Sequence, residues 1–441
     1  MHKKIDSYLK LNRSLFCVPG HKGIINKYDL TELPETDDLY DPKEYISSLE
    51  SRISRLYNSN ISVISTGGNT LCIQTMLRIF FQTSGELIVL RNVHKSVVNT
   101  MILLGIHPIW IAFSYNIINI LSSINHAIDT NPNAKAIFLT SVDYYGNILD
   151  IKNICNIVHK KNKNILILVD NSHGSHLKFT RNSNLHPLDC GADACADSAH
   201  KTLPVLTGGA WLHVNKKIEI KEIKTSMGLF GSTSPSFLII NSIQNCINWL
   251  EINCKLKFNI FFNMVKYIKK CAENSKILCN FCNDPGRIVL DFCNYKTTDQ
   301  EILKYFNKYK IEPEFVLNKK VVLIPSPFNK YKDWLRLECA VLLKKIRFNF
   351  VYCEKYTKEN HDIYLDLPKV ILNLREAMFL ESESVVTENS AGRICAEVAC
   401  KCPPGTIIVA PGELIGENEQ KNLLNNKIIG IKVIKKNISG Y

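Results

Sequence analysis

Several features that would place the chain outside the soluble globular class are missing from the sequence. No apolar run reaches the roughly 18 residues that a membrane span needs. Residues 1–7 read MHKKIDS and lack the apolar core of a secretion signal. Internal repeats and low-complexity tracts are also lacking. We therefore expect a soluble, cytoplasmic protein that does not act at a membrane.

Basic residues and cysteines are the two unusual features of the composition. Fifty-four Lys and Arg against 41 Asp and Glu give a net charge of +13, which admits a nucleic-acid partner. The lysines are spread along the chain, however, so we expect no nucleic acid and assign part of the excess to an anionic cofactor. The 16 cysteines predict packed thiols in a reducing compartment. The pairs Cys279/Cys282 and Cys400/Cys402 lie too far apart for finger-like zinc spacing, and we expect no metal.

From about residue 61 to residue 214, short apolar runs alternate with helical periods. Strands are expected at 87–90, 109–111, 136–140 and 165–170, and helices at 96–104 and 151–159. Near-continuous apolar strands separated by helices favour a parallel sheet covered on both faces. Functional groups in such sheets gather at the carboxyl ends of the strands.

The second half of the chain changes character. Residues 236–272 have a helical pattern, and strands follow at 288–291 and 321–324. A last segment from about residue 368 is rich in turns. We predict an N-terminal segment and large domain over 1–250, a linking helix and small α+β domain over 251–365, and a C-terminal domain over 366–441.

Lys201, in the segment DSAHKT at 197–202, is the first candidate for chemistry. A lysine that forms a Schiff base needs neighbours that favour its neutral form and hold a polar ligand. Asp170 ends an apolar strand, where a carboxylate can keep the pyridine nitrogen of pyridoxal 5′-phosphate (PLP) protonated. A surface lysine and a helix N-cap are the competing interpretations of these two residues.

Two further elements precede Asp170 in the chain. His94 falls between a strand and a helix, where an imidazole can stack on a flat ring. The segment STGGNT at 65–70 opens a helical stretch with a glycine pair, and free amides at a helix start can hold a phosphate. Each is weak alone, since loop histidines and Gly-Gly turns are common.

Taken in order, these elements resemble the PLP-dependent Orn/Lys/Arg decarboxylases, particularly short bacterial forms without an N-terminal wing. The resemblance spans nearly the whole chain. The segments that carry it are VPGHKG at 18–23, D-x-TE and DDL within 29–39, RNVHKSV at 91–97, DYYG at 143–146, VDNSHGSH at 169–176, SAHKTL at 198–203, SPSF at 234–237, REA at 375–377, AGRI at 391–394, PPG at 403–405 and PGE at 411–413.

The resemblance implies an α/β fold of the aspartate aminotransferase type, with smaller α+β and C-terminal domains. It implies PLP on Lys201, Asp170 at the ring nitrogen, His94 on the ring and His173 beside it. The residues expected to bind the cofactor are Gly68, Asn69, Thr70, His94, Asp170, His173, Ser198, His200 and Lys201, with Lys201, His94 and Asp170 catalytic. Glu338 and Glu413 are expected candidates for the basic end of a substrate.

The expected reaction is decarboxylation of arginine, lysine or ornithine to an amine and CO₂, as in polyamine biosynthesis, by a homodimer or higher oligomer. An aminotransferase, a lyase or a non-catalytic homologue stays open as an alternative. The proton donor to Cα is Lys201 or His94. Four positions depart from the family pattern: Gly68-Asn69 in the phosphate turn, Asn171-Ser172 after Asp170, Gln244 after SPSF, and Cys402 before PPG.

Overall fold

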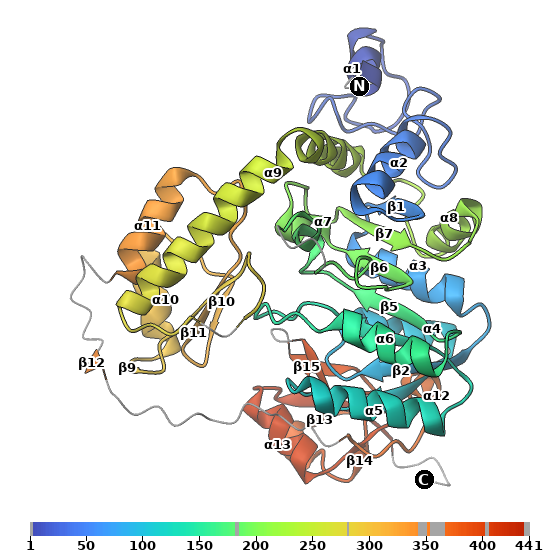
Figure 1. Cartoon of the computed structure of the whole chain (residues 1–441). Coiled ribbons are helices and arrows are strands. Elements are labelled where there is room, and N and C mark those ends of the chain that lie inside the picture. Colours follow the sequence, from blue (N-terminus) through green and yellow to red (C-terminus); the bar gives the residue numbers. More distant parts are fainter. Residues whose placement is uncertain are drawn as a thin grey trace.

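The computed structural model of the chain describes residues 3–180, 185–279, 282–342, 351–352, 367–401 and 405–435. Cys402, Pro403 and Pro404, named above, lie outside the described residues. Figure 1 shows a large domain, a small domain joined to it by the long helix α9, and a C-terminal domain packed against the large one. None of the described helices combines the length and apolar character that a membrane span requires.

A seven-stranded sheet forms the centre of the large domain, in the order β1-β7-β6-β5-β4-β2-β3. The pairs from β3 through β6 are parallel, and β7 is antiparallel to both of its neighbours. The strands are β1 (Ile61–Ser65), β2 (Gly85–Leu90), β3 (Ile106–Ile111), β4 (Ala134–Thr140), β5 (Leu166–Asp170), β6 (Ala194–Asp197) and β7 (Ala210–Val214).

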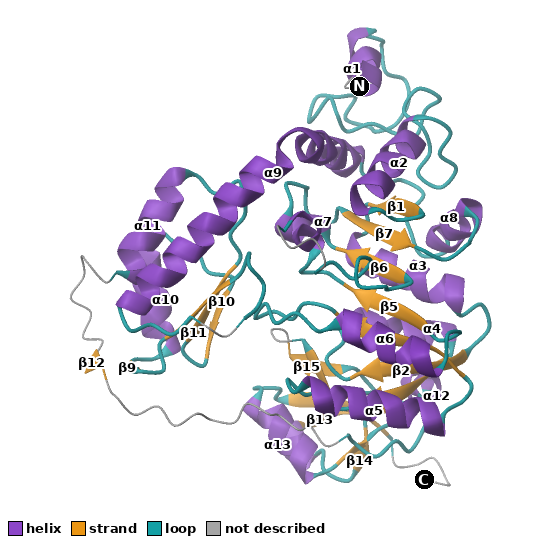
Figure 2. Cartoon of the chain, in the orientation of Figure 1, coloured by secondary structure: helices purple, strands orange, loops and turns teal. Residues whose placement is uncertain are grey.

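Helices cover both faces of this sheet (Figure 2). In β5, Leu168 packs on one face, whereas Ile167 and Val169 pack on the other, because successive side chains of a strand point to opposite sides. Burial on both faces explains why these strands read as continuous apolar runs. The helices up to this point are α1 (Lys3–Lys10), α2 (Tyr45–Tyr57), α3 (Gly68–Phe80), α4 (Lys95–Leu104), α5 (Ile117–Thr130), α6 (Ile151–Lys161), the 3-10 helix η1 (Ser175–Phe179), α7 (Ala199–Thr202) and α8 (Ile220–Gly228).

The helix α9 (Phe237–Asn274) is 38 residues long and belongs to both domains. Phe237 and Ile240 lie in the same buried cluster as Phe258, Phe261 and residues of the small domain. The small domain contains a three-stranded sheet in the order β10-β11-β8. Its elements are β8 (Ile288–Asp291), β9 (Tyr295–Lys296), α10 (Asp299–Lys308), β10 (Phe315–Leu317), β11 (Lys320–Leu323), α11 (Tyr331–Val341) and β12 (Val351–Tyr352).

The C-terminal domain is built from short antiparallel strand pairs around a small core. Its elements are α12 (Leu374–Phe379), β13 (Ser382–Val386), η2 (Thr387–Asn389), β14 (Arg393–Ile394), β15 (Ala399–Lys401), β16 (Thr406–Val409), β17 (Leu414–Ile415), α13 (Glu417–Asn425) and β18 (Gly430–Ile434).

The strands and helices predicted in the large domain all occur, with ends shifted by a few residues. The predicted helix over 236–272 is α9, and the predicted strands at 288–291 and 321–324 are β8 and β11. The proposed domain boundary after residue 250 falls inside α9, since this helix continues without a break through that position. The residue boundaries of the three predicted domains therefore stay a prediction.

Candidate active site

Lys201 lies at the edge of the large sheet where the parallel strands end. It sits on α7, which closely follows β6, and β5 runs parallel to β6 with Asp170 opposite Ala196. The residues after both strands therefore emerge at one edge. There Nζ of Lys201 lies 3.1 Å from Nε2 of His173 and 5.7 Å from the ring centre of Tyr144.

Asp170 is a buried carboxylate with 3% of its surface exposed. Its Oδ1 accepts hydrogen bonds from Nδ2 of Asn69 at 2.9 Å, and from N and Oγ of Ser172 at 2.9 and 2.6 Å. None of the described residues hydrogen-bonds to Oδ2, so one carboxylate oxygen can take a further donor. The next helix, η1, begins at Ser175 after Gly174, which excludes the interpretation of Asp170 as a helix N-cap.

The glycine turn before α3 fixes this aspartate. Gly68 has a φ of 69°, a conformation that glycine adopts without strain, and its amide donates to the carbonyl of Gly208 at 2.8 Å. The side chain of Asn69 is directed to Asp170 and to Oγ of Ser172, at 2.7 Å from the latter. Thr70 is exposed in the first turn of α3, where backbone amides have no partner within the helix and can bind an anion.

Ser198 and His200 lie at the start of α7. Ser198 is buried and immediately precedes α7. His200 contacts the carbonyl of Gly209 through Nδ1 at 3.0 Å. A carbonyl oxygen only accepts, so Nδ1 carries the proton. Because Gly208 in turn binds Gly68, the starts of α3 and α7 are held together.

His94 caps the N-terminus of α4, and its Nδ1 accepts from the amide of Ser96 at 3.2 Å. Burial lowers the pKa of His94, the negative charge of Asp170 opposes that change, and the positive charge of Lys201 adds to it. These influences indicate that His94, Asp170 and Lys201 share one electrostatic environment.

His173 lies between the side chains of Lys201 and Arg287. Its Nε2 faces Lys201, and its Nδ1 lies 3.5 Å from Nη2 of Arg287. Its ring is also 4.6 Å from that of Tyr144, centre to centre. Burial, followed by the neighbouring Lys201 and Arg287, holds the pKa of His173 well below its usual value. His173 is therefore neutral in the folded protein at physiological pH.

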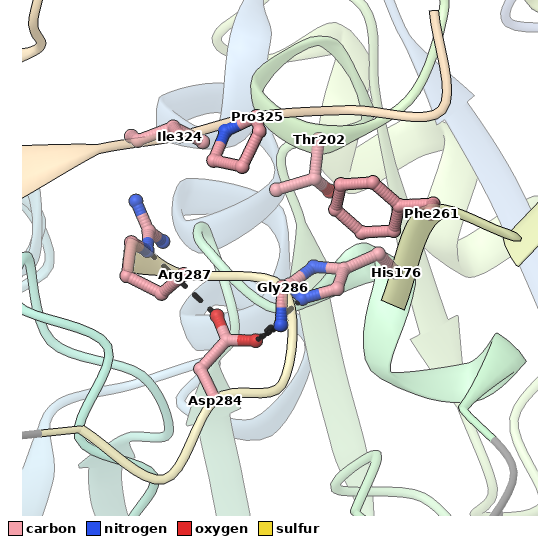
Figure 3. Close-up of a pocket in the computed structure, with 8 residues that line it drawn as sticks. All are labelled: His176, Thr202, Phe261, Asp284, Gly286, Arg287, Ile324 and Pro325. Carbon is pink, nitrogen blue, oxygen red and sulfur yellow. Dashed lines mark hydrogen bonds and ion pairs between the residues drawn. The ribbon is translucent and has the colours of Figure 1, made fainter. Parts of the chain in front are cut away.

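The small domain completes the site through the loop before β8. Asp284 accepts from Nε2 of His176 at 2.8 Å and from the amide of Gly286 at 2.7 Å. Burial alone would raise the pKa of Asp284, but His176 and Arg287 bring it below its usual range. Figure 3 shows these side chains around a small pocket lined by His176, Thr202, Phe261, Asp284, Gly286, Arg287, Ile324 and Pro325.

The sequence did not assign roles to Tyr144, His176, Asp284 or Arg287. Tyr144 and His176 lie in motifs that carried the family resemblance, DYYG and VDNSHGSH. The Asp-Pro-Gly turn at 284–286, directly before an apolar strand, is the signal that marks the other two. Asp284 and Arg287 are far from Lys201 in the sequence, so no local pattern linked them to it.

The comparisons with known proteins agree with this geometry. The family model described as "Orn/Lys/Arg decarboxylase, major domain" matches residues 1–324. The chain belongs to the Orn/Lys/Arg decarboxylase family. It is 24% identical to an arginine decarboxylase of Halalkalibacterium halodurans, covering 97% of this chain and 93% of the relative. It is 31% identical to the uncharacterised protein YaaO of Bacillus subtilis, covering 98% and 94%.

A solved structure supports the same fold. The constitutive lysine decarboxylase of E. coli superposes with a TM-score of 0.79 at 16% identity, covering 98% of this chain and 81% of that one. The predicted α/β fold of the PLP-dependent transferase type is thereby confirmed. Membership in the Orn/Lys/Arg decarboxylase family makes the chain an amino-acid decarboxylase.

The two carboxylates predicted to meet the substrate, Glu338 and Glu413, each have a side-chain partner in this decarboxylase. Both oxygens of Glu413 accept from the guanidinium of Arg91, at 2.7 and 2.6 Å. Glu338 lies on α11, and its Oε1 accepts from the hydroxyl of Tyr267 at 2.8 Å. Each carboxylate is thus engaged with a partner from another part of the chain, and its role toward a substrate stays a prediction.

A second polar cluster lies beneath the site. Asp197 contacts Nε2 of His186 at 3.0 Å, Nε2 of His213 at 3.6 Å and Nδ2 of Asn171 at 2.7 Å. With Cys195, His186 and Asp197 have donor atoms close enough to hold a metal ion. The hydrogen bonds already satisfy Asp197, and we assign this cluster to fixing the ends of β5 and β6. Of the two residues that depart from the family pattern here, Asn171 binds Asp197 and Ser172 binds Asp170.

Proposed function

We propose that this decarboxylase acts on a basic L-amino acid, arginine, lysine or ornithine, with PLP attached to Lys201. The observation that supports it best is the amine of Lys201 beside His173, at a sheet edge where Asp170 also ends a buried strand. The family name and the arginine decarboxylase relatives give the substrate class.

The side chains present fit PLP in their chemistry. Asp170 has one oxygen open to a protonated ring nitrogen, and Asn69 and Ser172 hold its other oxygen. The backbone amides of Asn69 and Thr70 at the start of α3, together with Ser198 and His200, would bind the phosphate. His94 would lie against the ring. When bound, PLP supplies an electron sink for the electron pair that remains after CO₂ departs.

The protein's own groups have three tasks in this proposal. Asp170 pairs with the ring nitrogen through its open carboxylate oxygen. Tyr144 and the loop with Arg287 restrict water around Lys201. Lys201 at Nζ, or His94 at Nε2, returns a proton to Cα, and both atoms belong to groups that influence each other electrostatically.

We further propose a cytoplasmic homodimer or higher oligomer that serves polyamine biosynthesis. Phe16, Ile24 and Ile25 near the N-terminus are strongly exposed apolar side chains, which suits a subunit contact. The described cysteines are free thiols, as expected of a reducing compartment. Light scattering on the purified protein tests the assembly, and a monomer would contradict it.

The activity is tested with purified enzyme, PLP and each of the three amino acids in turn. One of them should yield CO₂ and the corresponding amine in equal amounts, identified by mass. Lys201→Ala should lose both products, whereas Lys221→Ala, at an exposed lysine of α8, should keep them. A keto acid would indicate an aminotransferase, and no product from any substrate would refute the proposal.

A further inference from the structure

Arg287 is a buried cation with very few partners. Only 1% of its surface is exposed, and its Nε and Nη1 have no hydrogen-bond partner among the described residues. Its Nε lies 3.7 Å from Oδ2 of Asp284, and its Nη2 lies 3.5 Å from His173. Burying a guanidinium with so few hydrogen bonds is unfavourable, so its position calls for a role.

The fold holds Arg287 at this place. A Cβ atom on Gly146 would lie 2.7 Å from Cγ of Arg287, so only glycine leaves room for its stem. The amide of Asp284 donates to the carbonyl of Gly146 at 3.0 Å, which fastens the small-domain loop to the large domain. The guanidinium is thus brought to His173 by contacts between two domains.

Hydrogen-bond chemistry then determines where the protons lie between Arg287, His173 and Lys201. A guanidinium only donates, so Nδ1 of His173 must accept from Arg287. A neutral imidazole with an accepting Nδ1 carries its proton on Nε2. That Nε2–H points at Nζ of Lys201, 3.1 Å away, and a nitrogen that accepts a hydrogen bond must hold a lone pair. An ammonium group has none.

We infer that Arg287 is a positioning residue that, through His173, holds Lys201 as a neutral amine ready to attach PLP. The inference rests on the proposed function, in which Lys201 carries the cofactor. The charged or titratable groups facing His173 are Lys201, Arg287, His176 and His94, and burial is the first cause of its lowered pKa.

The attachment step needs the neutral amine. The lone pair of Nζ forms a bond to the aldehyde carbon of PLP, and the aldehyde oxygen leaves as water with both amine protons. An ordinary lysine, with a pKa of about 10.4, is almost entirely protonated at neutral pH and cannot begin this step. Without Arg287, Nδ1 of His173 is free to take the proton, and Nε2 then accepts from a protonated Lys201.

The experiment measures attachment of PLP to the full-length apoenzyme. PLP is added between about pH 6.5 and about pH 11, a range that extends from well below to just above the pKa of an ordinary lysine. Samples are reduced with borohydride at intervals, and the modified peptide is identified by mass. In the Arg287→Met variant, PLP should attach to Lys201 at least about tenfold more slowly near neutral pH. This factor corresponds to the loss of one hydrogen bond that involves a charged group. The rate of the variant should approach that of the wild type at the alkaline end.

Arg52→Met is the matched control, because Arg52 is also a buried arginine but binds Glu251 and Asn248 away from the site. Its pH profile should follow the wild type. An Arg287→Met rate that is unchanged, or reduced equally at every pH, would overturn the inference and indicate no role or a purely structural one. If the wild type itself leaves Lys201 unmodified, the proposed function fails, and this inference falls with it.

Discussion

The buried ion pair between Arg91 and Glu413 joins the large domain to the C-terminal domain, and breaking it should loosen that junction. Each side chain is 1% exposed. Two hydrogen bonds join them, and Arg91 also donates to the carbonyls of Ile407 and Ile408 at 3.1 and 3.2 Å. Its guanidinium lies 4.6 Å from the ring centre of Trp110.

Glu413→Leu leaves the guanidinium buried without its counter-charge. Removing one partner of a buried pair costs about 3–5 kcal/mol, whereas replacing both by apolar residues is often nearly neutral. We therefore expect Glu413→Leu to lower the free energy of opening the junction by about 3–5 kcal/mol. Arg91→Met combined with Glu413→Leu should recover most of that loss.

Hydrogen exchange of the backbone amides in β16 measures this opening directly, and fluorescence of Trp110 reports the loss of the nearby cation. Lys435→Met is the matched control, because its pair with Glu381 is 47% and 78% exposed and contributes at most about 1 kcal/mol. If Glu413→Leu exchanges no faster than this control, the ion pair does not hold the junction. If the double variant is as unstable as the single one, the unpaired charge is not the cause.

Three other perturbations test the site. Gly146→Ala should reduce decarboxylation at least about tenfold, because the added Cβ would lie 2.7 Å from Cγ of Arg287 and the φ of Gly146 is +87°. Gly392→Ala is the control for backbone strain alone, because Gly392 has a φ of +77° and a Cβ there would meet nothing within 4 Å. Equal losses of activity in the two variants would count against the contact with Arg287. His173 has a pKa lowered by burial and by neighbouring cations, so the unfolded chain binds its proton at a higher pH than the folded chain does. The contribution of neutral His173 to the free energy of unfolding should thus be fully present above about pH 6.5 and decline as the pH falls below that value. Calorimetry above and below this pH should show a smaller decline for His173→Gln than for the wild type. An identical decline would contradict the assignment of a lowered pKa to His173. Asn69→Ala removes a donor from the carboxylate that it holds and should weaken PLP binding about fivefold, the value of one hydrogen bond, by equilibrium dialysis; unchanged affinity would show that this donor is dispensable.

Local sequence patterns determined much of the large domain. Alternating apolar runs and helical periods predicted the parallel strands, since burial on both faces demands apolar residues along the whole strand. Asp170, at the end of a predicted strand, was expected at the edge where functional groups gather, and the family resemblance placed Lys201 with it. The family resemblance added roles for His94 and His173 that spacing alone does not provide.

Only the tertiary structure decided which polar groups meet. The sequence placed Asn69 in the phosphate turn but did not indicate that its side-chain amide binds Asp170. It did not indicate that Arg91 binds both oxygens of Glu413. It was silent on Arg287, which reaches His173 because the small domain packs against the large one. A residue's neighbours along the chain set its local conformation and burial, but the partner of a buried charge depends on how distant elements dock, and no local pattern encodes that docking.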